Sequence, residues 1–253
     1  MKLKAFAKIN LCLDVLRKDD RFCYHKIQTV FHEVKSIFDE IELTEAKNRD
    51  LFFAFSPPKL KTQVRMPKSE DMILKALSLV RKTFKIKKFV KIKVKKKIPF
   101  ASGFGGGSSD AAAVLKGLNK LWELKLSQKS LAKLGAKLGM DVPFFIYGGT
   151  AIGKNYGEKI AQLPEIKNIK FKIYPQKTAG LSRKTAAAYE KLDLKKCGKN
   201  LKKTKLLIRG VKTRDKKLII ENLHNDFETI LKNPLLKNRH LTGAGPSTFS
   251  ASK

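Results

Sequence analysis

Cysteine is scarce in this chain, and its spacing excludes two classes of small stabilised domain. The 253 residues include only Cys12, Cys23 and Cys197. Three cysteines at such wide intervals fit neither a disulfide framework nor the paired ligand spacing of a zinc site. We therefore expect a protein of the reducing cytoplasm that has no structural metal.

Long hydrophobic runs are also absent. No apolar stretch approaches the roughly 18 residues of a membrane span, and Lys8, Asn10 and Asp14 interrupt the N-terminal segment, so we expect neither a signal peptide nor a membrane partner. Hydrophobic residues make up 42%, which is typical of a globular protein. The length suits one large domain or two of about 100–150 residues. We expect two domains, comprising residues 1–158 and 159–253.

Acidic residues are few beside the basic ones. The chain carries 55 Lys plus Arg against 22 Asp plus Glu, a net charge of +33. Such a field attracts polyanions, so a basic nucleic-acid-binding protein is one class of function to consider. However, the densest lysine run, residues 191–217, has no aromatic side chain on which a base could stack. We expect solvated lysine-rich faces and no specific nucleic-acid partner.

The most informative segment of the sequence is residues 103–113, where four glycines are followed by small residues that are compatible with a helix. Its four glycines are Gly103, Gly105, Gly106 and Gly107. Glycine permits positive φ angles and a close approach of the backbone to a ligand. We expect a helix to open at Ala111, capped by Ser108, Ser109 and Asp110. A glycine turn that enters a helix N-terminus is an anion site, and phosphate is its expected occupant.

Two familiar phosphate loops do not match this segment. A Walker A loop ends in Gly-Lys-Ser/Thr, whereas here the glycines run directly into Ser108 without a lysine. Ser108 also takes the place of the third glycine of a dinucleotide fingerprint. In the preceding strand Val90, Ile92 and Val94 alternate with lysines, so one face only is apolar. The loop therefore belongs to a different class.

The first strand carries two polar residues on one face. Apolar residues alternate with more polar ones from Ala5 to Val15, which predicts a strand with one buried face. Lys8 and Asn10 lie two residues apart and so share a face. They could hold a phosphate and a hydroxyl, or they could simply face solvent. The strand pattern alone leaves both interpretations open.

Three further segments carry candidate groups. Tyr24-His25, placed at a turn, offers an aromatic face and an imidazole edge to a base. Asp141 precedes an apolar segment with Pro143 in its first turn, which predicts a helix N-cap. Residues 243–246 form a second glycine-containing turn, which is either a hairpin turn or part of a site.

The remaining periodicity predicts alternating helices and strands. Strands are expected at residues 27–31, 51–55, 90–94 and 169–174. Helices are expected at residues 71–83, 111–124, 127–138, 183–191 and 215–227, with another before Pro234 and a loop at Pro57-Pro58.

Three segments together resemble the motifs of the GHMP small-molecule kinases, in their order. They are Ala7–Leu11, Gly103–Ala113 and Leu241–Pro246. Other segments are similar to the branch of that superfamily that acts on a cytidine diphosphate-linked methylerythritol. They are Tyr24-His25, Thr29–Phe31, Gly107–Ala112 and Gly139–Phe145. The likeness covers nearly the whole chain.

The resemblance implies an α+β fold of two domains. The N-terminal one would be like ribosomal protein S5 domain 2 and the C-terminal one ferredoxin-like. It also implies transfer of the ATP γ-phosphate, with Mg²⁺, to the 2-hydroxyl of that substrate in non-mevalonate isoprenoid synthesis. One alternative is another acceptor, such as homoserine or mevalonate, which Tyr24-His25 disfavours because those molecules carry no base. A basic nucleic-acid-binding protein on a related scaffold is the other.

By the same likeness, Lys8 and Asp141 form the catalytic pair and Asn10 holds the polyol. Tyr24 and His25 hold the cytosine, and Tyr189 supplies a second stacking face. The turn expected near the phosphates and the acceptor comprises Gly243, Ala244 and Gly245. The ATP phosphates would be held by Pro99, Ala101, Ser102, Gly103, Phe104, Gly105, Gly106, Gly107, Ser108, Ser109 and Asp110. Of these, Ser109 and Asp110 are the expected oxygen donors to Mg²⁺.

The sequence departs from the family pattern in three places. Cys23 stands where a glycine usually precedes Tyr-His, and Asp71 replaces an asparagine of the adenine-side loop. The chain stops at Lys253, where relatives continue, so either the second domain is trimmed or the chain is incomplete. We expect a monomer or a weak homodimer.

Overall fold

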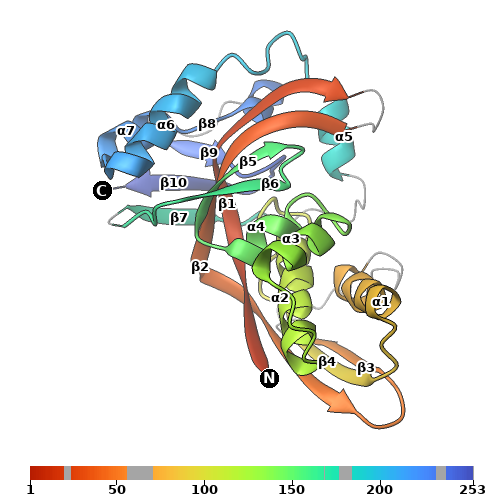
Figure 1. Ribbon diagram of the computed structural model, residues 1–253. Helices are drawn as coiled ribbons and strands as arrows, with labels where there is room; N and C mark the ends of the chain where they lie inside the picture. The colour runs from red at the N-terminus through yellow and green to blue at the C-terminus, as the bar shows by residue number, and fades with distance from the viewer. Residues whose placement is uncertain (20–23, 56–70, 168, 177–183, 232–237, 253) are drawn as a thin grey trace. The chain divides into compact units, whose positions relative to one another are not determined.

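The computed structural model describes residues 1–19, 24–55, 71–167, 169–176, 184–231 and 238–252 (Figure 1). The chain divides into two compact units. Unit 1 comprises Met1–Ala7, Lys35–Pro99 and Gly105–Tyr147, and unit 2 comprises Lys8–Val34, Phe100–Phe104 and Gly148–Lys253. The units interleave along the chain and so do not coincide with the expected ranges 1–158 and 159–253. The reason is that two long strands, β1 (Lys2–Asp19) and β2 (Tyr24–Ala46), each contribute to both units.

The larger sheet has the strand order β3-β4-β2-β1-β8, with β5 pairing to β2 and β6 pairing to β5. In unit 1, β4 (Phe89–Lys95) is antiparallel to residues 40–46 of β2 and parallel to β3 (Leu51–Phe55). In unit 2, β5 (Thr150–Asn155) is antiparallel to residues 27–32 of β2 and to β6 (Lys159–Leu163). The short β8 (His224–Asn225) runs parallel to β1.

Unit 1 contains four helices among its described residues. They are α1 (Met72–Phe84), α2 (Gly106–Leu121), α3 (Gln128–Ala136) and α4 (Val142–Tyr147), which gather together in Figure 1. The alanine-rich α2 is their centre, because it packs against each of the other three. A Cβ at its Gly117 would lie 2.2 Å from Leu43 Cδ1 and 2.7 Å from Leu3 Cδ1, so the helix rests directly on β1 and β2.

Unit 2 adds a second sheet of three antiparallel strands, in the order β7-β10-β9. These are β7 (Lys170–Tyr174), β9 (Arg239–Leu241) and β10 (Thr248–Ser252). Its helical elements are α5 (Lys184–Glu190), α6 (Leu201–Thr213), α7 (Lys216–Glu221) and the 3₁₀ turn η1 (Asp226–Ile230). A core cluster that includes Leu13, Val15, Phe227 and Leu241 joins β1 to the end of the chain.

The expected strands at 51–55, 90–94 and 169–174 and the helix at 71–83 are confirmed, with boundaries shifted by one or two residues. The start of α2 is wrong. It opens at Gly106 rather than Ala111, its N-cap is Gly105 at φ 73°, and no side chain caps it. Ser108, Ser109 and Asp110 therefore lie inside the helix. Glycine makes this early start possible, because a Cβ at Gly106 would lie 2.9 Å from Ile98 Cγ2.

The single helix expected at 215–227 is also wrong. The helix α7 ends at Glu221, and the chain then forms β8 and η1 because His224 and Asn225 pair with β1. Of the residues before Pro234, where a helix is expected, Asp226–Ile230 form the turn η1, and residues 232 and 233 lie outside the described part of the chain, as does the loop expected at Pro57-Pro58.

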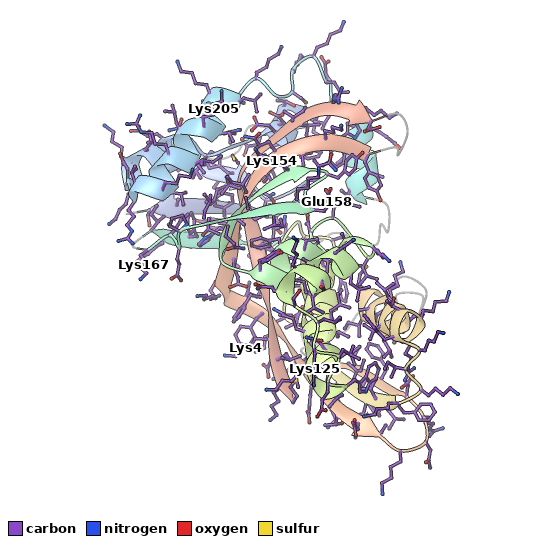
Figure 2. The ribbon with its side chains drawn as sticks, viewed as in Figure 1. Lys4, Lys125, Lys154, Glu158, Lys167 and Lys205 are labelled. Atoms are coloured by element: carbon purple, nitrogen blue, oxygen red, sulfur yellow. The ribbon has the colours of Figure 1, made fainter. Side chains whose placement is uncertain are left out.

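The lysine run of residues 191–217 includes a helix that its composition did not reveal. In α6 the buried positions are Thr204, Leu207, Gly210 and Val211, which share one face at helical spacing. The lysines occupy the other face, and Figure 2 shows Lys205 pointing away from the ribbon. Elsewhere, Lys4, Lys125 and Lys154 are likewise exposed. The net charge is thus carried on exposed faces. No helix in the described residues is long and apolar enough to cross a membrane.

Candidate active site

Lys8 is buried in β1 rather than facing solvent, with 3% of its surface exposed. Its ammonium donates to Asn10 Oδ1 at 2.6 Å and lies 5.7 Å from the ring centroid of Phe31. Burying an ammonium is costly unless polar groups surround it. Lys8 therefore occupies a prepared polar position, which decides against the solvent-facing interpretation left open by the strand pattern.

Asn10 connects Lys8 to the second glycine turn. Its Oδ1 accepts from Lys8 Nζ and, at 2.8 Å, from the Gly243 amide, while its Nδ2 donates to Thr29 Oγ1 at 2.8 Å. The Thr29 hydroxyl in turn donates to the Cys12 carbonyl at 2.6 Å. A carboxamide has two acceptor sites and two donor hydrogens. Most of the bonding capacity of Asn10 therefore positions Lys8 and the turn, and its expected contact with the polyol stays a prediction.

The turn at residues 242–245 packs backbone to backbone against residues 102–104. A Cβ at Gly103 would lie 2.2 Å from the Thr242 carbonyl oxygen, and Gly103 has φ 87°, so this position requires glycine. Thr242 Oγ1 donates to the Gly103 carbonyl at 3.2 Å. Asn225 Nδ2 donates to the Gly243 carbonyl at 2.8 Å. Unit 2 thus brings Lys8, Asn10 and the two glycine segments into one place.

The expected phosphate loop is split between the units. Pro99 and residues 105–110 belong to unit 1, whereas Ala101, Ser102, Gly103 and Phe104 belong to unit 2. Only Gly103 and Gly105 of the four loop glycines have positive φ, because Gly106 and Gly107 are helical. The Phe104 side chain is fully buried and so serves the core. The first N–H groups of α2 have no partner within the helix, so the phosphate site expected from the sequence would use the amides of Gly105–Ser108, and it stays a prediction.

Asp141 directly precedes α4, in the position expected of an N-cap, and Pro143 lies in the first turn. The segment before it lies beside the start of α2. A Cβ at Gly139 would be 3.9 Å from Ser108 Oγ and 3.6 Å from Met72 Cε. Unit 1 therefore places the segment that leads to Asp141 next to the first turn of α2.

A buried ionic cluster lies next to the first turn of α2. Lys96 Nζ donates to Asp39 Oδ2 and to Asp110 Oδ2, each at 2.5 Å. Burial alone would lower the pKa of Lys96, but the two carboxylates outweigh it and raise that pKa. Burial raises the pKa of Asp110 to about 7, against the opposing effect of Lys96. No sequence pattern distinguishes Lys96 or Asp39, because both lie in segments where charged residues are common.

The cluster bears on the expected Mg²⁺ ligands. Asp110 Oδ2 accepts from the Lys96 ammonium, and Asp110 Oδ1 is buried with no hydrogen-bond partner. A dication beside that ammonium would be repelled, and Mg²⁺ keeps several bound waters for which a buried oxygen leaves no room. Asp110 therefore does not fit a Mg²⁺ ligand. Ser109, also buried, stays a prediction.

Tyr24 and His25 begin β2 rather than forming a turn, so their side chains point to opposite faces of the strand. His25 stacks on Tyr189, with ring centroids 4.7 Å apart and an interplanar angle of 17°. Tyr24 instead lies beside Tyr156 at 5.5 Å and is half exposed. The structure thus pairs His25 with Tyr189 and separates Tyr24 from them. Burial, and then the charge of Lys18, lower the pKa of His25.

Another buried polar cluster in unit 2 joins β1, β8 and α6. Metal-ligand atoms of Cys12, Asp14 and His224 lie within 4.8 Å of one another. Protein groups already satisfy them, since Thr204 donates to Asp14 and His224 Nε2 lies 3.2 Å from Asp14 Oδ1. Burial raises the pKa of Cys12 to about 12, which keeps the thiol protonated. We interpret this cluster as a structural network.

Comparison with known proteins places this geometry in a family. Residues 71–149 match the GHMP kinases N terminal domain. The 4-diphosphocytidyl-2-C-methyl-D-erythritol kinase of Caldicellulosiruptor saccharolyticus is 36% identical, over 98% of this chain and 87% of its own length. The enzyme of the same name from Alkaliphilus metalliredigens is 35% identical, over 100% and 88%. The chain belongs to the 4-diphosphocytidyl-2-C-methyl-D-erythritol kinase family. It is a small-molecule kinase with the α+β fold of the GHMP kinases.

Solved structures agree on that fold. A crystal structure of 4-(cytidine 5'-diphospho)-2C-methyl-D-erythritol kinase has a TM-score of 0.74 at 22% identity, covering 100% of this chain and 90% of its own. Homoserine kinase from Cytophaga hutchinsonii also has a TM-score of 0.74, at 18% identity and with 100% and 84% covered. Because both folds match equally well, the choice of acceptor depends on sequence and on the site, not on architecture.

Proposed function

We propose that this kinase transfers the γ-phosphate of ATP to the 2-hydroxyl of 4-diphosphocytidyl-2-C-methyl-D-erythritol, in the non-mevalonate route to isoprenoids. The observation that carries the choice of acceptor is the His25-Tyr189 stack. A stacked aromatic pair with an imidazole edge suits a nucleobase, and homoserine and mevalonate have none. The name of the relatives, at 33–36% identity, supports the same acceptor.

Lys8 is the proposed charge stabiliser. Phosphoryl transfer passes through a loose transition state whose charge lies on the oxygens of the transferred group. An ammonium held in place before the reaction stabilises that charge without reorganisation. Asn10 and the packed turn at Gly243 hold the Lys8 ammonium in this way.

Asp141 is the proposed partner that orients the acceptor hydroxyl and takes its proton late in the transfer. Its place directly before α4, with Pro143 in the first turn, fixes where its side chain starts in unit 1. The mechanism requires that Lys8 and Asp141 reach the same hydroxyl during turnover.

The amides at Gly105–Ser108 are the proposed cradle for the ATP phosphates. Mg²⁺ would supply further charge neutralisation when it accompanies the nucleotide, and no step here depends on a protein ligand to it. Gly243, Ala244 and Gly245 are proposed to lie near the acceptor, held there by Asn10 and Asn225.

We further propose that the protein acts in the cytoplasm. Two of its thiols, those of Cys12 and Cys197, are free and buried, which suits a reducing compartment. Its oligomeric state, a monomer or a weak homodimer, stays a prediction.

A coupled assay of ADP release tests the choice of acceptor. The purified protein is given ATP and Mg²⁺ with the cytidyl substrate, homoserine or mevalonate in turn, and kcat/KM is compared. We expect the cytidyl substrate to exceed the others by at least about 10³-fold, because a site built for polar contacts strongly rejects acceptors that lack the matching groups. A faster reaction with homoserine or mevalonate would instead assign the chain to another acceptor.

A further inference from the structure

The buried cluster of Asp39, Lys96 and Asp110 has no place in the mechanism above, yet it adjoins the proposed phosphate cradle. All three residues are at most 8% exposed. One ammonium is shared between two carboxylates, each 2.5 Å away. A buried ion pair is weak evidence for stability, because desolvation offsets much of the attraction. A cluster of this kind therefore calls for an explanation other than stability alone.

The cluster connects the two ends of the glycine loop. At one end, Asp39 Oδ1 accepts from the amides of Lys97 and, at 2.9 Å, Ile98, which fixes the segment that leads into the loop. At the other end, Asp110 lies in the first turns of α2. Lys96 joins them, and its Nζ would be 3.6 Å from a Cβ at Gly106, the first residue of the helix.

We propose that Lys96 is a positioning residue, which fixes the start of α2 through Asp110, and that Asp110 serves as its anchor instead of binding Mg²⁺. This inference rests on the proposed function, because it assumes that ATP phosphates bind at that helix start. The effect is indirect. If the first turn of α2 shifts, its amides no longer converge on the phosphates, and the anion site loses its geometry.

The charges make the proposal testable by a rescue. Removing only the ammonium leaves two buried carboxylates facing each other, which is strongly unfavourable. Removing the charge of Asp110 as well relieves that repulsion, because Asp39 keeps its two backbone donors. A lysine that touched the nucleotide directly could not be rescued in this way, since its own contact would still be missing.

The variants are Lys96→Met, Asp110→Asn and the double variant, with Lys97→Met as the matched control. Lys97 is the next residue, and its ammonium pairs with exposed Glu40 outside the cluster. The readouts are the dissociation constants of ATP and ADP by calorimetry and the Mg²⁺ concentration for half-maximal rate. Circular dichroism reports whether each variant folds.

We expect Lys96→Met to weaken ATP and ADP binding by about tenfold or more, and the double variant to return to within about threefold of Asp110→Asn. Coupling of that size is usual between residues of one network. We expect Asp110→Asn to leave the half-maximal Mg²⁺ concentration within about twofold, whereas loss of a protein ligand raises it by about tenfold or more. Lys97→Met should match the parent protein.

Two results would overturn the inference. One is a double variant that folds but binds nucleotide as poorly as Lys96→Met, which indicates direct contact. The other is a strongly raised Mg²⁺ requirement for Asp110→Asn, which indicates a metal ligand. If Lys96→Met does not fold, the comparison of the double variant with Asp110→Asn still decides the matter. Failure of the unmodified protein to bind ATP would count against the proposed function instead.

Discussion

At the scale of single residues, the proposed chemistry depends on buried polar side chains that neighbouring groups hold in place. Lys8 is the clearest case, because its neighbours Asn10, Thr29 and Gly243 form a continuous chain of hydrogen bonds. Removing Lys8 should therefore affect the chemistry more than the fold or the binding of substrate.

Lys8→Ala is expected to lower kcat by about 10²–10³-fold, the usual effect of losing one preorganised charge stabiliser, while KM for the cytidyl substrate rises less than about fivefold. Steady-state kinetics with the coupled assay measures both. Lys8→Met, which fills more of the buried space, serves as the control for packing. If KM rises strongly while kcat holds, Lys8 is a binding residue only.

Asp141→Asn is expected to lower kcat by at least about 10³-fold, because the amide keeps the shape of the side chain but cannot accept the hydroxyl proton. ATP binding, measured by calorimetry, should stay within about twofold. Parental kcat in this variant would remove Asp141 from the mechanism.

His25 gives a pH dependence whose sign follows from its surroundings. Burial and Lys18 lower its pKa below the ordinary 6.5, so the imidazole is neutral at pH 7 and charges only as the pH falls below that value. The neutral ring has one donor and one acceptor nitrogen, and protonation removes the acceptor. KM for the cytidyl substrate should thus be nearly flat between about pH 7 and 8 and rise as the pH falls below the ordinary value of 6.5.

His25→Gln is the matched variant, because glutamine keeps a donor and an acceptor but does not titrate. Its KM should be higher at pH 7 and nearly independent of pH. An unchanged rise of KM at low pH in this variant would mean that another group titrates.

The candidate residues were found from sequence to different degrees. Lys8 and Asn10 lie in a recognisable strand pattern, and the glycines lie in a recognisable loop pattern. The sequence alone therefore identifies these residues as candidates. The pairing of His25 with Tyr189 depends on a contact over more than 160 positions, and the Asp39-Lys96-Asp110 cluster on strand register. Neither contact follows from a local sequence pattern. The ionic cluster is especially hard to foresee, because lysine and aspartate in such segments are usually solvated.

At the scale of secondary-structure elements, helix ends decide where functional groups lie. The sequence predicts the start of α2 five residues too late, because serine and aspartate usually cap helices. In the structure Gly105 is the N-cap, and the helix includes those residues. The helix α6 is hard to find from the sequence for a related reason. Its buried face consists of Thr204, Leu207, Gly210 and Val211, of which only Leu207 and Val211 are strongly apolar, and the lysines around them dominate the composition.

Asp71, which departs from the family pattern, lies at the start of a helix, where aspartate and asparagine can both serve as caps. Its Oδ1 accepts from the Ile73 amide at 2.8 Å and the Leu74 amide at 3.4 Å, so it is the N-cap of α1. Asp71→Ala should therefore lower the free energy of unfolding by about 0.5–2 kcal/mol. Urea denaturation followed by circular dichroism measures the change.

Asp71→Asn is the control for that experiment, because asparagine caps helices as well as aspartate does. It should stay within a few tenths of a kcal/mol of the parent, as expected for an equally good cap. Equal losses in the two variants would show that the charge of Asp71, not its capping bond, supports α1.

At the scale of the whole molecule, the net charge of +33 has a simple distribution. Apart from Lys8 and Lys96, none of the lysines that the structure describes is buried. Such lysines attract anions in general but do not select one. We expect the choice of a particular ligand to come instead from the buried polar side chains of each unit, which are far apart in the sequence.

The most direct test of the central claim is the identity of the product. After incubation with ATP, Mg²⁺ and 4-diphosphocytidyl-2-C-methyl-D-erythritol, phosphorus and carbon NMR locate the new phosphate. The account predicts one phosphate per ADP formed, bonded to the oxygen on carbon 2 of the methylerythritol. ADP released without phosphorylation of the substrate, or a phosphate on another hydroxyl, would contradict it.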